Sequence, residues 1–350
     1  MSTFTLPPAL EPGDHIAVVA PASNPRHEAP HVYERGLERL TSTFDLTPVE
    51  FPTADMDRET LYDRPDVRAE DVMAAFEDPN IRGVMPVIGG NDQIRILPHL
   101  DPERLQANPT RFFGYSDNTN LGLYLWNLGI VSFYGPSIMA ELAMDKAMFE
   151  HTIEYTERAM FDESLGHLEP AQHFTDEPGN WDDPEALDIP RDVESHPGWD
   201  WSGGDQPVTG RTWGGCLEIL DQQFVVGRYL PDTEEIDGTI LVLETSEEVP
   251  DPAWVTGILQ ALGERGDLQR FAGVMVGRPP ARSHRDERPS GWRAAYRTRQ
   301  QDAIRKVCER YNPEAPIVQG IQFGHTWPTV PIPIGGQVTL DPTEETIAFA

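Results

Sequence analysis

Short apolar runs alternate with more polar segments in the first 135 residues. Each run has four to six residues, which is the length of a buried β-strand, and most of them end in small or polar residues. The predicted strands are residues 16–20, 83–88, 111–115 and 131–134. In α/β folds, ligands bind at the carboxyl ends of the strands of the sheet. The loops that follow these runs are therefore the first candidates for a functional site.

The segments between these runs show helical periodicity. Apolar side chains recur at three- and four-residue spacing at 33–40 and again at 121–128, and Asn118 is placed to cap the second helix. Strands that alternate with helices predict a parallel sheet with helices on both faces. The N-terminal part is therefore predicted to be an α/β domain built on a parallel sheet.

The rest of the chain divides into two regions. Periodicity is lost from about residue 166 to 210, where Pro, Asp, Glu and Gly dominate and Trp181, Trp199 and Trp201 occur. Beyond it, strands are expected at 238–244, 272–277, 317–321 and 337–340, and helices at 254–262 and 292–311. We predict an N-terminal domain over 1–165, a connection or substrate loop over 166–206, and a smaller mixed α/β domain over 207–350.

The charge excludes some function classes. The chain has 58 acidic and 27 basic residues, a formal charge of −31, and only two of its basic residues are lysines. Such a chain is neither a general nucleic-acid binder nor a ligand of anionic membranes. Carboxylates spread along the whole chain instead predict a halophilic protein, since high salt screens their repulsion.

Several common signatures are absent from the sequence. Cys216 and Cys308 form neither a disulfide framework nor a metal motif, and there is no leader-like segment or membrane-length apolar run. The turn at Gly89 and Gly90 is not a dinucleotide fingerprint, and no Walker motif occurs. We therefore expect a cytoplasmic protein with no metal and no cofactor.

Three polar residues at predicted strand ends could form a nucleophilic site. Ser116 follows one strand and directly precedes a helix, as in a nucleophile elbow, although the final glycine of that motif is missing. His325 lies in an uncharged loop after a strand and could act as its base; Glu244 ends a buried strand and could orient the imidazole. Each residue also has a simpler interpretation: Ser116 as a helix cap, His325 as a structural side chain and Glu244 as part of a solvated acidic turn.

Several strings resemble the LD-carboxypeptidase family of serine peptidases. They run in order over nearly the whole chain: GDHIAVVAPAS at 13–23, IGGND at 88–92, FGYSDNT at 113–119, FYGP at 133–136, GGCL at 214–217, ILVLETSE at 240–247 and FGHT at 323–326. The long middle segment and the sequence after Leu243 are closest to the microcin C immunity branch. One departure is Cys216, which stands where the family often has Asn.

The resemblance implies a catalytic triad of Ser116, His325 and Glu244 and an oxyanion hole from the backbone N–H groups of Gly90 and Asp117. It also implies an N-terminal Rossmann-like domain and a smaller C-terminal domain with the active site between them. The family resemblance further implies a homodimer whose substrate is a small peptide or a peptidyl or aminoacyl nucleotide. A tryptophan of the middle loop stacks on the base in that branch, and Trp181 is our candidate. Two alternatives stay open: an LD-carboxypeptidase acting on murein-type or other small peptides, and a non-catalytic protein that binds peptidyl nucleotides. A little-perturbed His325 would have a pKa of about 6–7.

Overall fold

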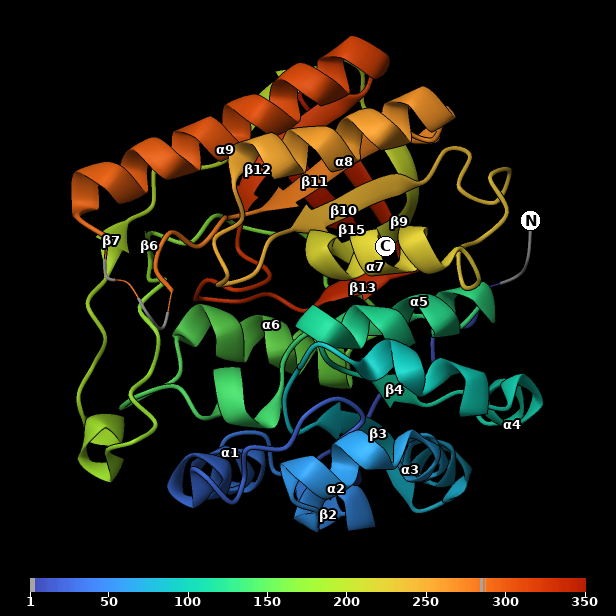
Figure 1. The fold of residues 1–350 in the computed structure, drawn as a ribbon, viewed down its shortest axis with the longest axis vertical. Helices are drawn as coiled ribbons and strands as arrows, with labels where there is room; N and C mark the ends of the chain where they lie inside the picture. The colour runs from blue at the N-terminus through green and yellow to red at the C-terminus, as the bar shows by residue number, and fades with distance from the viewer. Residues whose placement is uncertain (1–3, 284–285, 287) are drawn as a thin grey trace.

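The structure is a computed structural model that describes residues 4–283, 286 and 288–350. In Figure 1 the N-terminal half lies at the bottom, in blue to green, and most of the C-terminal half lies at the top, in yellow to red. Each half is built on its own sheet. The predicted fold class is confirmed: an N-terminal parallel sheet is followed by a mixed α/β region.

The N-terminal sheet has the strand order β2-β1-β3-β4, and all of its pairs are parallel. Side chains of β1 alternate between two hydrophobic clusters, with Ile16 and Val18 in one and Ala17 and Val19 in the other. Both faces of the sheet are therefore covered, as expected for a parallel sheet. The strands are β1 (His15–Val19), β2 (Thr47–Glu50), β3 (Ile81–Pro86) and β4 (Arg111–Phe112). The helices are α1 (Pro30–Ser42), α2 (Arg58–Asp63), α3 (Pro65–Glu77), α4 (Pro102–Ala107), α5 (Thr119–Asn127) and α6 (Glu150–Phe161).

The fourth predicted strand is present but does not extend this sheet. β5 (Ser132–Tyr134) forms an antiparallel ladder with β13 (Ile332–Ile334) of the C-terminal half. It touches the N-terminal sheet through a single parallel bridge between Phe113 and Phe133. β4 ends after two residues because the chain turns at Gly114, where φ is +133°, so a longer ladder is not available there.

Asn118 does not cap α5 with its side chain, contrary to the prediction. Its amide donates to the carbonyl of Tyr115 at 3.1 Å and accepts from Gln93 at 2.7 Å. The side chain therefore joins the turn around Ser116 to the neighbouring 88–93 loop instead of binding an N–H of its own helix.

The C-terminal sheet has seven strands in the order β15-β14-β9-β10-β11-β12-β8. Its centre, from β9 to β12, is parallel, and the strands at both edges are antiparallel. These strands are β8 (Asp200–Gly203), β9 (Val208–Cys216), β10 (Ile240–Glu244), β11 (Gly273–Gly277), β12 (Pro316–Ile321), β14 (Gln337–Asp341) and β15 (Thr346–Phe349). The accompanying helices are α7 (Leu217–Val226), α8 (Pro252–Arg265) and α9 (Ser290–Tyr311).

Strand β9 escaped prediction because glycines occupy its sheet-facing positions. A Cβ on Gly214 would collide with the backbone of Val242, and one on Gly215 would lie 2.7 Å from the side chain of Thr119. Their φ angles of +130° and +152° also exclude most side chains. The close approach that these glycines allow brings β9 against both β10 and α5, at the junction of the two halves.

The middle segment is ordered by its pairing with the C-terminal sheet and by its own short ladder. β8 pairs with β12, so residues 200–203 belong to that sheet. β6 (His173–Phe174) and β7 (Glu194–Ser195) pair with each other, and the chain between them runs down the side of the molecule that is at the left of Figure 1. Within the described residues, no helix is long and apolar enough to cross a membrane.

Candidate active site

Ser116 occupies a strained turn between β4 and α5. Its φ is +62°, a left-handed conformation that costs a non-glycine residue roughly 1–3 kcal/mol and often occurs at functional sites. A short helical turn, Ser116–Asn118, follows at once and leads into α5. The hydroxyl of Ser116 makes no hydrogen bond within the described residues, so it remains available to react.

The 88–93 loop packs directly on this turn. A Cβ on Gly89 would lie 2.8 Å from Ser116 Cβ, 3.1 Å from its Oγ and 3.5 Å from the backbone nitrogen of Asp117. Gly89 thus keeps open the space beside the serine hydroxyl. The N–H of Gly90, one of the two oxyanion donors implied by the resemblance, makes no hydrogen bond within the described chain.

Asp117 holds this loop in place with its side chain. Its buried carboxylate accepts from the N–H groups of Asp92 and Gln93, each at 2.9 Å, and from the amide of Asn120 at 2.9 Å. Burial raises the pKa of Asp117 to about 6, and the neighbouring Asp92 also raises it, while these donors oppose the increase. The side chain therefore has a structural role, and only its backbone N–H is left for an oxyanion.

His325 and Glu244 form a buried pair, as the sequence led us to expect. Nδ1 of His325 lies 2.7 Å from Oε2 of Glu244, and their exposed fractions are 8 % and 1 %. Gly324 has a φ of +87°, and a Cβ there would collide with the Glu244 carboxylate. The glycine before the histidine thus allows the close approach of carboxylate to imidazole. The ring of Tyr115 packs edge-on against the imidazole, with centroids 5.0 Å apart.

A second carboxylate, which the sequence did not identify, occupies the other ring nitrogen. Oε2 of Glu247 lies 3.3 Å from Nε2 of His325. Burial by itself lowers the pKa of His325, but the charges of Glu244 and Glu247 outweigh it and raise that pKa to about 10. The value of about 6–7 expected for an unperturbed site is therefore wrong, because two carboxylates face one imidazole.

Tyr134 connects the nucleophile turn with the acidic residue. Its hydroxyl donates to Oε1 of Glu244 at 2.6 Å and accepts from the N–H of Ser116 at 3.3 Å. Burial and the Glu244 charge raise the pKa of this phenol well above its ordinary value, so it stays protonated and can donate. Tyr134 lies on β5, and no local pattern in the sequence indicates that its hydroxyl reaches β10.

One cleft of about 1160 Å³ contains most of the expected site residues. Ser116, His325, Gly90 and Trp181 all line it, whereas Glu244 and the Asp117 side chain lie behind its surface. Ser116 and His325 do not hydrogen-bond to each other: within the described chain, Nε2 of His325 contacts Glu247 instead. The structure thus brings the expected residues to one place, with the imidazole paired to two carboxylates.

Cys216 lies at the inner end of the cleft. Its thiol is buried and donates to Glu218 at 3.3 Å, and its N–H donates to Thr119 at 3.1 Å. Burial, with Glu244 and Glu218 nearby, raises the pKa of this thiol well above its ordinary value, so it is not a thiolate nucleophile. No group of three or more potential metal-ligating side chains occurs among the described residues.

Comparison with known proteins agrees with this geometry. Residues 16–135 match the LD-carboxypeptidase N-terminal domain, and residues 209–340 match the LD-carboxypeptidase C-terminal domain. A putative carboxypeptidase of Vibrio cholerae is 28% identical in an alignment of 346 positions that covers 95% of this chain and 94% of that protein. The microcin C7 self-immunity protein MccF of Escherichia coli is 24% identical over 78% of this chain and 75% of its own length.

Among solved structures, an MccF-like protein from Streptococcus pneumoniae in complex with AMP superposes with a TM-score of 0.86. It is 28% identical, and the match covers 97% of this chain and 99% of that one. Both domain matches, the relatives and the fold point to the same enzyme class. The chain belongs to the LD-carboxypeptidase family of serine hydrolases, in its MccF-like branch.

Proposed function

We propose that this protein hydrolyses an amide bond of a peptidyl or aminoacyl nucleotide through Ser116, His325 and Glu244. The observation that carries the proposal is the buried His325–Glu244 pair, which opens into the same cleft as the strained, unbonded Ser116 hydroxyl. A serine is a weak nucleophile and needs such a base, and the base needs a carboxylate to fix its tautomer. AMP in the S. pneumoniae relative supports a nucleotide portion of the substrate.

The reaction is acyl transfer to water. Ser116 Oγ attacks the amide carbonyl while Nε2 of His325 takes the hydroxyl proton, which requires Glu247 to leave that nitrogen. The N–H groups of Gly90 and Asp117 stabilise the oxyanion of the tetrahedral intermediate. His325 then gives its proton to the leaving nitrogen, and water repeats the sequence on the acyl-enzyme to release the carboxylic acid.

Trp181 is proposed to stack on the nucleobase. It is partly buried on the middle segment and lines the cleft, so a ligand can reach one of its faces. We further propose that the active protein is a homodimer. The domain over 1–165 would supply the nucleophile, the loop over 166–206 would contact the substrate, and the domain over 207–350 would supply His325 and Glu244.

Replacement of the nucleophile tests the catalytic assignment. Ser116→Ala should lower kcat by roughly 10⁴–10⁶-fold and abolish labelling by a fluorophosphonate probe. Products of an aminoacyl sulfamoyl adenosine substrate, followed by mass spectrometry, provide the readout. Full activity in the alanine variant would refute the triad, and no wild-type turnover of any amide would favour the non-catalytic binding protein.

A second candidate substrate is a small LD-peptide with a free carboxylate. The specific observation in its favour is that the buried Arg191 and Arg282 line the cleft, because guanidinium groups bind carboxylates bidentately. Release of the terminal amino acid from an LD-tetrapeptide, with the nucleotide analogue left intact, would select this candidate.

A further inference from the structure

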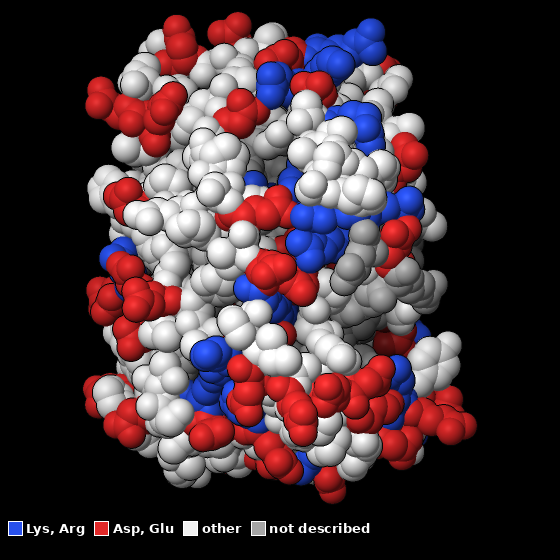
Figure 2. Space-filling model, turned by 90° about the vertical axis from the view of Figure 1, so that its left-hand side faces the viewer, with Lys and Arg blue, Asp and Glu red and all other residues white. Residues whose placement is uncertain are grey.

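An arginine cluster stands beside the active-site cleft, in contrast to the acidic chain around it. Five guanidinium groups meet four carboxylates, which leaves one positive charge locally in a protein of net charge −31. Figure 2 shows basic side chains gathered near the middle of this face, among scattered acidic ones. The cluster consists of Arg191, Arg278, Arg282, Arg293 and Arg297 with Asp145, Asp176, Glu177 and Glu194.

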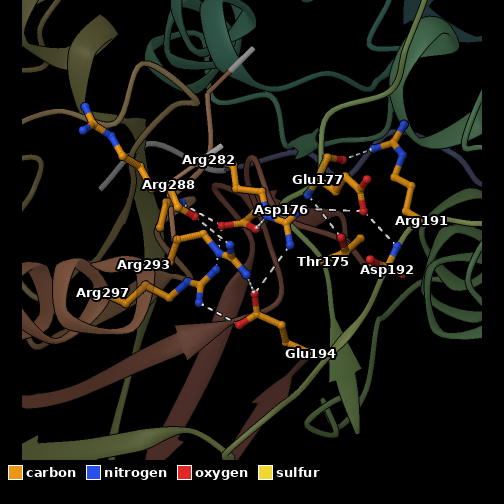
Figure 3. Close-up of polar contacts among 11 residues, drawn as sticks. Thr175, Asp176, Glu177, Arg191, Asp192, Glu194, Arg282, Arg288, Arg293 and Arg297 are labelled. Atoms are coloured by element: carbon orange, nitrogen blue, oxygen red, sulfur yellow. Dashed lines mark hydrogen bonds and ion pairs between the residues drawn. The ribbon is translucent and has the colours of Figure 1, made fainter. Parts of the chain in front are cut away.

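Two of these arginines have their charges fully used by protein partners. Arg297 bridges Asp176 at 2.6 Å and Glu194 at 3.0 Å, and Arg293 binds Glu194 at 2.6 Å (Figure 3). These contacts fasten the middle segment, which carries both carboxylates, to helix α9. They use both oxygens of Glu194 and Oδ2 of Asp176, whereas Oδ1 of Asp176 has no hydrogen-bond partner among the described residues.

Arg282 differs from the other four arginines of the cluster because it makes no hydrogen bond with the residues that the structure describes. It makes only loose ion pairs, at 3.2 Å to Asp176, 3.7 Å to Glu177 and 3.8 Å to Glu194. The Asp176 carboxylate already accepts from Arg297 and from the N–H of Ala281 through its other oxygen. The side chain of Arg282 is nevertheless only 11 % exposed, and it lines the cleft. Its Nε is buried without a hydrogen-bond partner in the described part of the chain, and a ligand oxygen that accepted from this guanidinium would lower the cost of that burial.

Arg191 and Trp181 place further free donors on the same wall. Arg191 uses Nε on Asp145 and Nη1 on the carbonyl of Glu177, while Nη2 makes no hydrogen bond within the described residues. That Nη2 lies 2.8 Å, and the indole nitrogen of Trp181 3.2 Å, from the point where a Cβ of Gly179 would be. Two N–H groups without partners among the described residues therefore face the position that a side chain at residue 179 would occupy.

We propose that Arg282, Arg191 and the Trp181 indole form a subsite for an anionic oxygen group of the substrate, a phosphate or a carboxylate. Guanidinium forks match the oxygens of both groups, and the enclosed wall strengthens the attraction. The proposed function decides only which molecule carries the anion. That group is the phosphate of a nucleotide or the carboxylate of a peptide. In either case the subsite places groups that bind an anion in the same cleft as Ser116.

Calorimetry with matched charged and neutral ligands tests the subsite at one fixed KCl concentration. AMP is compared with adenosine, and N-acetyl-D-alanine with its amide, on the wild-type protein, Arg282→Gln and Arg282→Lys. We expect at least one anion to bind more tightly than its neutral partner, and Arg282→Gln to weaken that anion about tenfold or more while leaving the neutral ligand unchanged. Arg282→Lys keeps the charge and should lose less.

The ligand whose affinity falls in Arg282→Gln identifies the anion that the subsite binds. A response of AMP indicates a phosphate, and a response of N-acetyl-D-alanine indicates a carboxylate. Arg288→Gln is the matched control, because Arg288 pairs with Asp286 and stacks on Trp292 outside the cleft lining. If the wild-type protein binds AMP and adenosine equally, and N-acetyl-D-alanine and its amide equally, the proposed subsite is refuted without any variant. Equal weakening of the charged and the neutral ligand by Arg282→Gln would also refute it. Retained amidase activity in Ser116→Ala would instead refute the catalytic assignment and leave this comparison intact.

Discussion

Glu247 helps Glu244 to raise the pKa of His325, and the replacement of Glu247 gives a specific prediction. The general base must be neutral at Nε2 to accept the serine proton, so the reaction should speed up as pH rises through the pKa of His325. Two carboxylates raise that pKa to about 10. Glu247→Gln keeps the size of the side chain and removes one of the two charges, so the pKa should fall.

The contact distance sets the size of this effect. Two unit charges 3.3 Å apart attract by about 5 kcal/mol at an effective dielectric constant of about 20. The Glu247 side chain is 42 % exposed, and solvent screening reduces such a pair to about 1 kcal/mol. Since 1.36 kcal/mol corresponds to about one pKa unit, we expect the pKa to fall by about one unit.

The assay is the pH dependence of kcat/KM on an aminoacyl sulfamoyl adenosine. The rising limb should move to lower pH in Glu247→Gln, with a gain of up to about tenfold at pH values below the wild-type pKa. Glu248→Gln is the matched control, because Glu248 lies in the same loop and lines the cleft but does not contact His325. An unchanged limb, or one moved to higher pH, would refute the view that Glu247 raises the pKa of His325.

Three further predictions test the surroundings of the site. Gly89→Ala should place a Cβ 2.8 Å from that of Ser116 and lower kcat by about 100-fold, whereas Gly257→Ala, which meets nothing within 4 Å, should not; equal kcat values would contradict the packing argument. Tyr134→Phe should remove a buried donor to Glu244 and cost about 1–3 kcal/mol of unfolding free energy, measured by urea denaturation, and a smaller loss would mean that another donor replaces it. Because the net charge is −31, Tm should rise between about 0.1 M and about 3 M KCl; a fall would argue against a halophilic protein.

The positions of the candidate residues could be predicted because they follow buried strands. Glu244 ends β10, which is otherwise a continuous apolar run, and His325 follows β12, whose six residues are all buried. Parallel strands bring their carboxyl ends to one edge, so sequence patterns alone bring these side chains near each other. The same reasoning placed Ser116 after β4, although that strand is only two residues long.

The rest of the site depends on contacts between distant elements. Tyr134 reaches Glu244 across 110 positions of sequence, and nothing near it indicates a buried acceptor. Glu247 reaches His325 from a loop in which Val249 adopts a φ of +54°, a conformation that local propensity does not favour. The arginine cluster likewise joins α9 to a segment without periodicity, so its members cannot be paired from the sequence.

The ladder between β5 and β13 makes catalytic activity dependent on the contact between the two halves of the chain. It holds the half of the chain that carries Ser116 against the half that carries His325 and Glu244. The rate of hydrolysis therefore depends on the contact between the two halves. A mild denaturant that separates them would abolish activity while each half kept its helices and strands.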